Sequence, residues 1–274
     1  MIDSRTAIAF IGGGNMASAI IGGLLQQGTP ATSINVVEPL PAARQALVDK
    51  YKVRVHEQVG EFLRDTGLVV WAVKPQIFKE VALALAPEVG QALHLSVAAG
   101  IASDSIALWL GNERIVRAMP NTPALVGLGM TGLYARPAVG AAERQQVERI
   151  ATSVGEALWV EREELLDAVT AVSGSGPAYF FYVLEAMTEA GVALGLGREQ
   201  AYRLAVQTAR GASELAHRSD EPAELLRQRV TSKGGTTHEA ITTLEAGGLK
   251  PLFAQALQAC ARRARELGEE FGKG

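Results

Sequence analysis

Cysteine is nearly absent from this sequence of 274 residues, because Cys260 is the only one. A single cysteine excludes a disulfide within the chain and every Cys-x-x-Cys metal site. The 4 histidines, His56, His94, His217 and His238, do not have the spacing of metal ligands, so no metal is expected. Basic residues are not in excess either. The formal net charge of -3 provides no electrostatic footprint for a nucleic-acid partner.

Long apolar runs are also missing. No stretch approaches the ~20 residues that span a bilayer. The first ten residues do not combine a basic start with a long apolar run, so a signal peptide is not expected. These absences predict a soluble, cytoplasmic chain without a membrane partner. No Ser/His/Asp set and no pair of catalytic carboxylates is evident, which favours catalysis by positioning of the reactants.

The sequence does contain a glycine-rich turn between an apolar strand expected at 7–11 and a helix that begins near Ala17. Gly12, Gly14 and Ala17 match the G-x-G-x-x-G/A fingerprint of dinucleotide-binding domains. The glycines permit a tight turn and a close approach of the pyrophosphate, and the free N–H groups of the helix start would face the phosphates. The alternative is a plain strand–turn–helix. The predicted cofactor-binding residues of this turn are Gly12, Gly13, Gly14, Asn15 and Met16.

A second strand, expected at 34–38, ends in Glu38. An acid placed roughly twenty residues after such glycines usually hydrogen-bonds the ribose hydroxyls of the cofactor. The alternative is a solvated glutamate at a strand end. A carboxylate here repels a 2′-phosphate, whereas Arg44 in the helix expected at 41–51 could offset that repulsion. The cofactor is therefore predicted to be NADH or NADPH, with the preference left open.

Further strands are expected at 54–55, 68–73, 93–97, 114–119, 130–134 and 156–160. The strand at 68–73 is apolar at every residue, which is typical of a parallel strand covered on both faces. Lys74-Pro75 is expected to end this strand and open a loop. Because the carboxyl ends of parallel strands border the ligand crevice, we expect the loops at Lys74, Ala99 and Asn121 to converge on the nicotinamide half of the cofactor.

From residue 163 onward the pattern predicts only helices, at 163–172, 177–194, 198–217, 222–231, 236–246 and 250–271. The predicted fold class is α/β, with an N-terminal Rossmann-type dinucleotide-binding domain over residues 1–162 and an all-α dimerisation and substrate domain over residues 163–274. The helix at 177–194 is apolar on all sides and needs burial that a small helical domain can seldom supply alone. A partner subunit is therefore expected.

One segment of the helical half predicts a ligand site. A helix ends near Val230, Gly234 and Gly235 turn the chain, and a threonine-rich helix begins at Thr236. Free backbone N–H groups of Gly235, Thr236 and Thr237, together with two hydroxyls, would bind a small anion such as a carboxylate. The alternative is an ordinary N-cap, in which the threonines satisfy the orphan donors.

The segment Ser232–Thr237, followed by Ala240-Ile241 and Leu244-Glu245, resembles the signature of pyrroline-5-carboxylate reductases. The segments at 72–75, 98–100, 119–123, 167–170 and 173–179 resemble the same family, so the resemblance covers essentially the whole chain in order. It implies transfer of a hydride from NAD(P)H to the C=N bond of 1-pyrroline-5-carboxylate, which gives L-proline in the last step of proline biosynthesis. It also implies dimers that interlock through the helical domains and often assemble further, commonly as a pentamer of dimers.

The resemblance implies roles for individual residues. Thr237 would be the catalytic contact, with its hydroxyl on the ring nitrogen of the substrate. The substrate-binding residues would be Glu163, Gly234, Gly235, Thr236 and Thr237. Besides the glycine turn and Glu38, the cofactor would be held by Ala72, Val73, Lys74, Pro75, Ala98, Ala99, Gly100 and Asn121.

Two residues depart from the family pattern, and two other functions are alternatives. Lys233 stands where the family usually carries proline, and Glu38 stands where members that prefer NADPH tend to have a small hydroxyl residue. A β-hydroxyacid dehydrogenase-like reductase has the same layout, but its catalytic lysine has no counterpart because residues 163–217 contain no lysine. A non-catalytic dinucleotide-sensing module would bind the cofactor without turnover. The anion corner at 234–237 argues for a second ligand and against that module.

Overall fold

The computed structural model describes residues 7–89 and 91–272. The chain divides into two compact units, and the division does not coincide with residue 162. Unit 1 contains the chain up to Ser175 together with the end of the last helix from Ala259, and unit 2 is Gly176–Gln258. Residues 163–175 fall in unit 1 because they pack on its sheet. A Cβ on Gly132 in the sheet, for example, would lie 2.6 Å from Val169.

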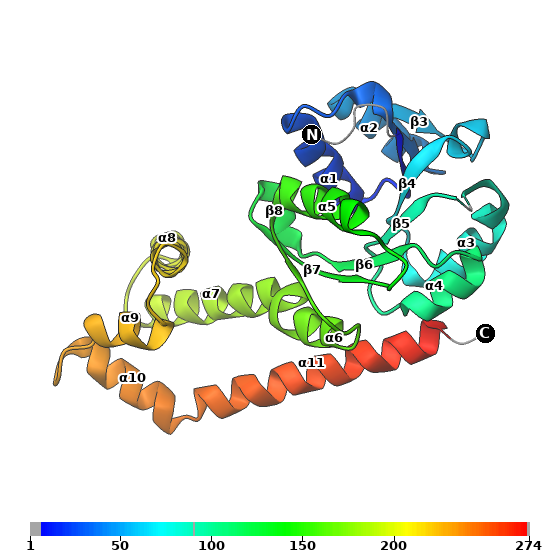
Figure 1. Ribbon diagram of the computed structural model, residues 1–274. Coiled ribbons are helices and arrows are strands. Elements are labelled where there is room, and N and C mark those ends of the chain that lie inside the picture. The colour runs from blue at the N-terminus through cyan, green and yellow to red at the C-terminus, as the bar shows by residue number, and fades with distance from the viewer. Residues whose placement is uncertain (1–6, 90, 273–274) are drawn as a thin grey trace. The chain divides into compact units, whose positions relative to one another are not determined.

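Unit 1 is built on one 8-stranded sheet (Figure 1). Its strands are β1 (Ala7–Ile11), β2 (Ile34–Val37), β3 (Arg54–His56), β4 (Thr66–Trp71), β5 (Leu93–Ser96), β6 (Ile115–Met119), β7 (Gly129–Ala135) and β8 (Gly155–Trp159). The spatial order is β3-β2-β1-β4-β5-β6-β7-β8. Strands β1 to β6 are parallel, whereas β7 runs antiparallel to β6 and carries β8 parallel to itself. The direction of winding reverses between β1 and β4, which confirms the predicted Rossmann-type topology.

Helices cover both faces of this sheet. They are α1 (Asn15–Gln26), α2 (Pro41–Tyr51), α3 (Pro75–Val89), α4 (Ser103–Leu110), α5 (Ala141–Ala151) and α6 (Leu165–Val169), the last continued by a π-helical turn over Thr170–Gly174. Alternate residues of β1 enter two separate cores. Ile8 and Phe10 pack with α1 and α5, whereas Ala9 and Ile11 pack with α3 and α4. A strand buried on both faces is apolar at every position, as expected from the sequence.

The segment after β4 differs from the prediction. The strand ends at Trp71 and not at Val73, and Pro75 is the first residue of α3 and does not open a loop. Proline is favoured at the first position of a helix, because its missing N–H would have no intrahelical acceptor there and its fixed φ suits the helix. Residues 72–74 are therefore a short turn at the carboxyl edge of the sheet.

Unit 2 consists of helices. They are α7 (Gly176–Ala193), α8 (Arg198–His217), α9 (Ala223–Arg229), α10 (Thr236–Ala246) and the first part of α11 (Leu249–Gly272), whose end belongs to unit 1. Helices α7 and α8 pack together at small residues, since a Cβ on Gly191 would lie 2.9 Å from the Cβ of Ala201. The predicted helical region is confirmed. No helix in the described residues is long and apolar enough to cross a membrane.

Candidate active site

The glycine turn lies at the carboxyl end of β1, next to the point where the winding of the sheet reverses. Gly12 has a φ of 96°, and a Cβ there would lie 2.6 Å from the carbonyl oxygen of Ala72, so only glycine fits. Gly14 precedes α1, and no described atom lies within 4 Å of where its Cβ would be. The first turn of α1 carries no acidic residue. This open, electropositive helix start fits a pyrophosphate.

The loops after β4 and β5 lie beside this turn. Ala72 donates its backbone N–H to the carbonyl of Ile11 at 2.8 Å, and Val97 donates to the carbonyl of Trp71 at 3.0 Å. The structure therefore brings together the glycine turn and the segments 72–75 and 98–100, as expected for parallel neighbours in the sheet. Lys74 and Ala99 are exposed at this edge. Contact of these residues with a cofactor remains a prediction.

Glu38 is not a solvated strand-end residue, and that alternative is wrong. Its side chain is buried, and Oε2 accepts the backbone N–H of Gly13 at 2.9 Å while Oε1 accepts that of Leu40, also at 2.9 Å. The carboxylate thus fixes the middle of the glycine turn. Because a carboxylate has about four acceptor sites, it retains capacity for a ribose hydroxyl.

The guanidinium of Arg44 is bonded to neighbouring groups of the same chain. It donates to the carbonyl oxygens of Glu38 at 3.1 Å and Pro39 at 2.7 Å, and it pairs with Glu57 at 2.9 Å. A 2′-phosphate would have to compete with these acceptors for the arginine, and it would also lie near the Glu38 carboxylate. For a ribose placed at Glu38, these contacts predict a preference for a free 2′-hydroxyl, and the choice between NADH and NADPH stays a prediction.

Asn121 has a clear structural role. Its Nδ2 donates to the carbonyl of Ser173 at 3.1 Å, and its Oδ1 accepts the backbone N–H of Met130 at 2.9 Å. The segments at 119–123 and 173–179, which both carry the family resemblance, thus meet in unit 1. A Cβ on Gly174 would lie 2.5 Å from Met119, which shows how tightly they pack. A contact of Asn121 with the cofactor stays a prediction, and the second N–H of Nδ2 and the second lone pair of Oδ1 remain for it.

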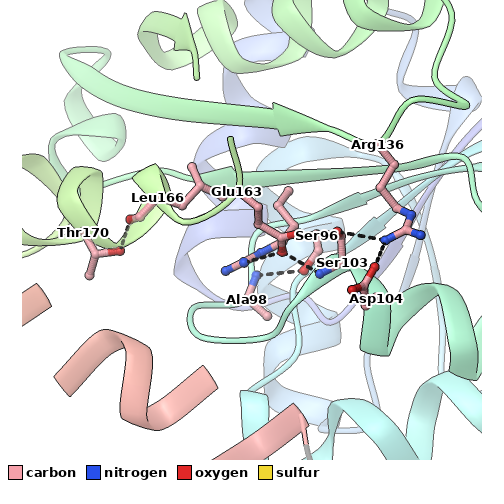
Figure 2. Close-up of polar contacts among 9 residues, drawn as sticks. Ser96, Ala98, Ser103, Asp104, Arg136, Glu163, Leu166 and Thr170 are labelled. Carbon is pink, nitrogen blue, oxygen red and sulfur yellow. Dashed lines mark hydrogen bonds and ion pairs between the residues drawn. The ribbon is translucent and has the colours of Figure 1, made fainter. Parts of the chain in front are cut away.

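Glu163 is the centre of a polar network that the sequence did not reveal (Figure 2). Its Oε1 accepts the backbone N–H of Ser103 at 2.6 Å and the Arg117 guanidinium at 2.6 Å. The Ser103 hydroxyl donates to Oε2, and Arg136 donates to that hydroxyl at 3.2 Å. Because Ser103 is the first residue of α4, Glu163 caps the helix that follows the 98–102 loop. The available signal was Arg117, a charged residue inside the otherwise apolar strand β6.

Glu163 also borders a cleft of about 520 Å³ within unit 1. Gly100, Arg117, Asp167 and Arg265 line the same cleft, which joins the 98–102 loop to α6 and the end of α11. Burial raises the pKa of the Asp167 carboxyl, and the nearby Arg117 and Arg265 oppose this effect. The position next to the 98–100 segment is compatible with the predicted place of Glu163 beside a substrate.

The anion corner lies in unit 2 and differs in one respect from the prediction. Helix α10 begins at Thr236 after Gly235, and no side-chain cap is formed, so the alternative of an ordinary threonine cap is not what the structure shows. The N–H of Gly235 is not free, because it donates to the carbonyl of Ser232 at 3.0 Å in the turn. The N–H groups of Thr236 and Thr237 have no intrahelical acceptor in the first turn. The corner therefore offers two backbone donors and the two threonine hydroxyls.

Charged neighbours of the corner act in opposite directions. Lys233 is exposed beside Gly234, whose φ is 71°. Glu239 lies in the first turn of α10 and weakens the attraction of that helix start for an anion. No group of three or more potential metal ligands is found among residues 7–89 and 91–272.

The doubly wound sheet and the open glycine turn define the class of the protein, an oxidoreductase that uses NAD(P)H. Residues 7–100 match the family model described as NADP oxidoreductase coenzyme F420-dependent, and residues 163–267 match the model for pyrroline-5-carboxylate reductase dimerisation. The chain belongs to the pyrroline-5-carboxylate reductase family.

Individual relatives agree with this assignment. The chain is 49% identical over 273 residues to the pyrroline-5-carboxylate reductase of Pseudomonas aeruginosa, which covers 98% of this chain and 100% of that protein. The structure of a pyrroline-5-carboxylate reductase from Coxiella burnetii superposes with a TM-score of 0.91 at 40% identity, over 96% of this chain and 98% of that one. The Plasmodium falciparum pyrroline carboxylate reductase with NADP bound has a TM-score of 0.85 at 28% identity, over 97% and 99% of the two chains. The resemblance inferred from the motifs is confirmed, and the two rival functions are not favoured.

Proposed function

We propose that this chain reduces the C=N bond of 1-pyrroline-5-carboxylate with NAD(P)H and forms L-proline, as the last step of proline biosynthesis. The observation that carries the proposal is the start of α10, where Thr236 and Thr237 present donors without a side-chain cap. A dinucleotide-binding domain needs only one anion site. A second one, in the family's dimerisation region, suits a substrate that carries a carboxylate.

The dinucleotide would lie along the edge formed by the glycine turn and the loops after β4 and β5. Gly14 and the first turn of α1 would face the pyrophosphate, and Glu38 would accept a ribose hydroxyl. The proposed contacts on the nicotinamide side are the segments 72–75 and 98–100, together with Asn121. When bound, the reduced cofactor would supply a hydride.

The substrate would be oriented by the corner of α10. Backbone N–H groups of Thr236 and Thr237 would bind the carboxylate, with Gly234 and Gly235 leaving room for it. The Thr237 hydroxyl would hold the ring nitrogen. A cyclic imine is basic enough to arrive protonated, so its carbon can accept the hydride while the C=N electron pair becomes the lone pair of the amine. No strong general acid is then required, and positioning supplies the catalysis.

We further propose a homodimer formed through α7. Phe180, Phe181 and Tyr182 are 62%, 60% and 72% exposed in the single chain, on a helix that bears apolar residues on all sides. An exposed patch of this kind marks an interface. The family resemblance supports the dimer and its assembly into a pentamer of dimers, in which one subunit presents substrate to the cofactor of another. The proposed location is the cytoplasm, where a single free cysteine suits the reducing conditions.

The proposal is tested by following oxidation of NADH and NADPH at 340 nm after 1-pyrroline-5-carboxylate is added to the purified protein. We expect turnover with at least one of the two cofactors, and proline as the product by amino-acid analysis. A protein that binds NADH or NADPH in a fluorescence titration but oxidises neither in the presence of the imine would instead be a dinucleotide-sensing module.

A further inference from the structure

The end of α11 packs directly on the loop that follows β5, and all of these residues belong to unit 1. A Cβ on Gly268 would lie 3.2 Å from the carbonyl oxygen of Gly100, which is closer than an ordinary van der Waals contact, so the loop would have to shift slightly to accept it. From the side of Gly100, the two segments are in van der Waals contact. A Cβ on Gly100 would lie 3.4 Å from the Cβ of Leu267 and 3.5 Å from the backbone nitrogen of Gly268.

Contacts one turn further along α11 strengthen this attachment. The Ser105 hydroxyl donates to the carbonyl of Gly272 at 3.2 Å, and a Cβ on Gly272 would lie 3.0 Å from the same hydroxyl oxygen. Phe271 packs against the core that contains Ile101 and Ile106. Ala264, Gly268 and Gly272 repeat every four residues, so they lie on one face of the helix.

The same loop is held at its other end. Glu163 accepts the backbone N–H and the hydroxyl of Ser103, so the residue that follows the loop is fixed. Gly100 has a φ of 74°, a conformation that other residues rarely adopt. The loop is therefore held between a helix cap and the end of α11, and its conformation depends on how closely α11 can approach.

We propose that Gly268 is a positioning residue for the dinucleotide: by letting α11 approach Gly100, it sets the conformation of the 98–100 segment. This inference rests on the proposed function only in assigning that segment to the nicotinamide side. Gly268 itself would not touch the cofactor. A Cβ at this position would push the carbonyl of Gly100 away and displace the segment that orients the nicotinamide ring.

The experiment compares Gly268→Ala, Gly268→Val and the control Gly211→Ala, each as the full chain. Gly211 is also a helical glycine, in α8, and no described atom lies within 4 Å of where its Cβ would be. Both alanine variants receive the same gain in helix propensity, so only the contact with the loop distinguishes them. A chain that ends after Leu267 removes the contact without adding bulk, and it serves as a second test if the valine variant does not fold.

We expect kcat/KM for the dinucleotide to fall about threefold in Gly268→Ala and tenfold or more in Gly268→Val. The Kd of the dinucleotide in a fluorescence titration should rise in the same order. The KM of the imine should stay within twofold of wild type, because the anion corner lies in unit 2. Gly211→Ala should behave as wild type, and the shortened chain should lose affinity for the dinucleotide.

The inference is overturned if folded Gly268→Val and the shortened chain both bind and use the dinucleotide as wild type does, whatever their melting temperatures. A purely structural role would lower the melting temperature and leave the Kd unchanged. The titration needs no turnover. If the wild-type protein binds the dinucleotide but does not reduce the imine, the proposed function fails while the titration still decides the role of Gly268.

Discussion

Unit 1 and unit 2 differ in what they do with their apolar residues. In unit 1, large side chains such as Phe10, Trp71 and Phe78 are completely buried between the sheet and its helices. In the described part of unit 2, the only buried apolar side chains are those of Ala201 and Ala205, whereas aromatic residues of α7 are exposed. Unit 1 thus buries its large apolar side chains within its own core, whereas unit 2 exposes them in a way that suits a surface covered by a second chain.

The difference teaches how each of the two proposed ligand-binding regions obtains its rigidity. The edge of unit 1 proposed to bind the dinucleotide is held by hydrogen bonds within one chain, such as that from Gly13 to Glu38 at 2.9 Å. The corner at the start of α10 is held by local bonds, such as that from the N–H of Gly235 to the carbonyl of Ser232 at 3.0 Å. Its order is expected to depend on assembly of the subunits, which the following predictions test from the largest expected effect to the smallest.

The contrast between the two units would lose its explanation if α7 did not form an interface between subunits. Phe181→Glu should convert the dimer to monomer and reduce turnover at least a hundredfold, because loss of a buried phenylalanine costs about 3–5 kcal/mol and each subunit loses one. Light scattering and the imine assay on the same sample measure both effects. Leu108→Glu is the matched control, since Leu108 is an exposed leucine of α4 in unit 1. A Phe181→Glu protein that remains an active dimer would refute the interface, which we expect to bury roughly 2,000 Å² or more.

The dense core of unit 1 should make the stability of the protein depend on pH through one buried histidine. His94 is fully buried, and its Nδ1 accepts the indole N–H of Trp71 at 3.1 Å. Burial, and to a lesser degree the charge of Arg114, lowers its pKa from 6.5 to about 4. The unfolded chain therefore binds the proton first as the pH falls. The stabilisation is complete above pH 6.5 and is lost as the pH decreases toward 4.

The size of this effect follows from linkage. A shift from 6.5 to about 4 corresponds to about 3 kcal/mol, at about 1.4 kcal/mol per unit. Urea unfolding of wild type and His94→Gln at pH 7 and pH 4.5 measures it, and the variant should lose less stability on acidification. Equal losses in the two proteins would show that His94 does not titrate on unfolding.

Removal of one hydroxyl in unit 2 should reduce the turnover of the imine and leave the binding of the dinucleotide unchanged. Thr237→Ala keeps the backbone donor and deletes one hydrogen bond of about 1–3 kcal/mol, so kcat/KM for the imine should fall roughly ten- to a hundredfold. The Kd of the dinucleotide should stay near wild type. Thr243→Ala in the same helix removes a hydroxyl that bonds only to the carbonyl of Glu239 at 2.9 Å, and it should remain active. A lower melting temperature with normal turnover would remove Thr237 from the site.

The smallest predicted effect concerns cofactor choice in unit 1. Glu38→Ser should shift the ratio of kcat/KM values toward NADPH by about 1–3 kcal/mol, through the lost bond to the 2′-hydroxyl and the removed repulsion of a 2′-phosphate. Glu38→Gln keeps the shape of the side chain and removes its charge, and its one amide oxygen can still accept the N–H of Gly13 while the bond from Leu40 is lost. It therefore separates repulsion of the phosphate from the structural bond to Gly13. An unchanged ratio in both variants would limit Glu38 to holding the turn.

Strands, helices and turns that are determined by the local sequence were predictable. The apolar strands, the helix at 198–217 and the helix at 236–246 agree with α8 (Arg198–His217) and α10 (Thr236–Ala246). The glycine turn was recognisable because backbone geometry leaves few alternatives to glycine at Gly12. Pro75 was misread because proline both ends strands and begins helices, and only the packing of α3 on the sheet decides between these outcomes.

Residues that act through long-range contacts were not predictable from pattern. Ser103, Arg117 and Arg136 meet at Glu163 only because β6, β7 and the start of α6 bring distant parts of the chain together. Glu38 was expected at the ribose, but its bond to Gly13 depends on the spacing of two neighbouring strands. Neither contact has a local sequence signature.

Local chemistry in this sequence therefore determined the class of the fold, the family motifs and the two helix starts that we propose to bind anions, because glycine turns and helix N-termini carry their properties in a few adjacent residues. The tertiary structure decided which charged groups are buried, that the Gly235 N–H is already used, and that Gly268 of the last helix lies against Gly100 of the 98–102 loop. These contacts join residues far apart in the chain, and burial and pairing at such distances are set by packing and not by sequence neighbours.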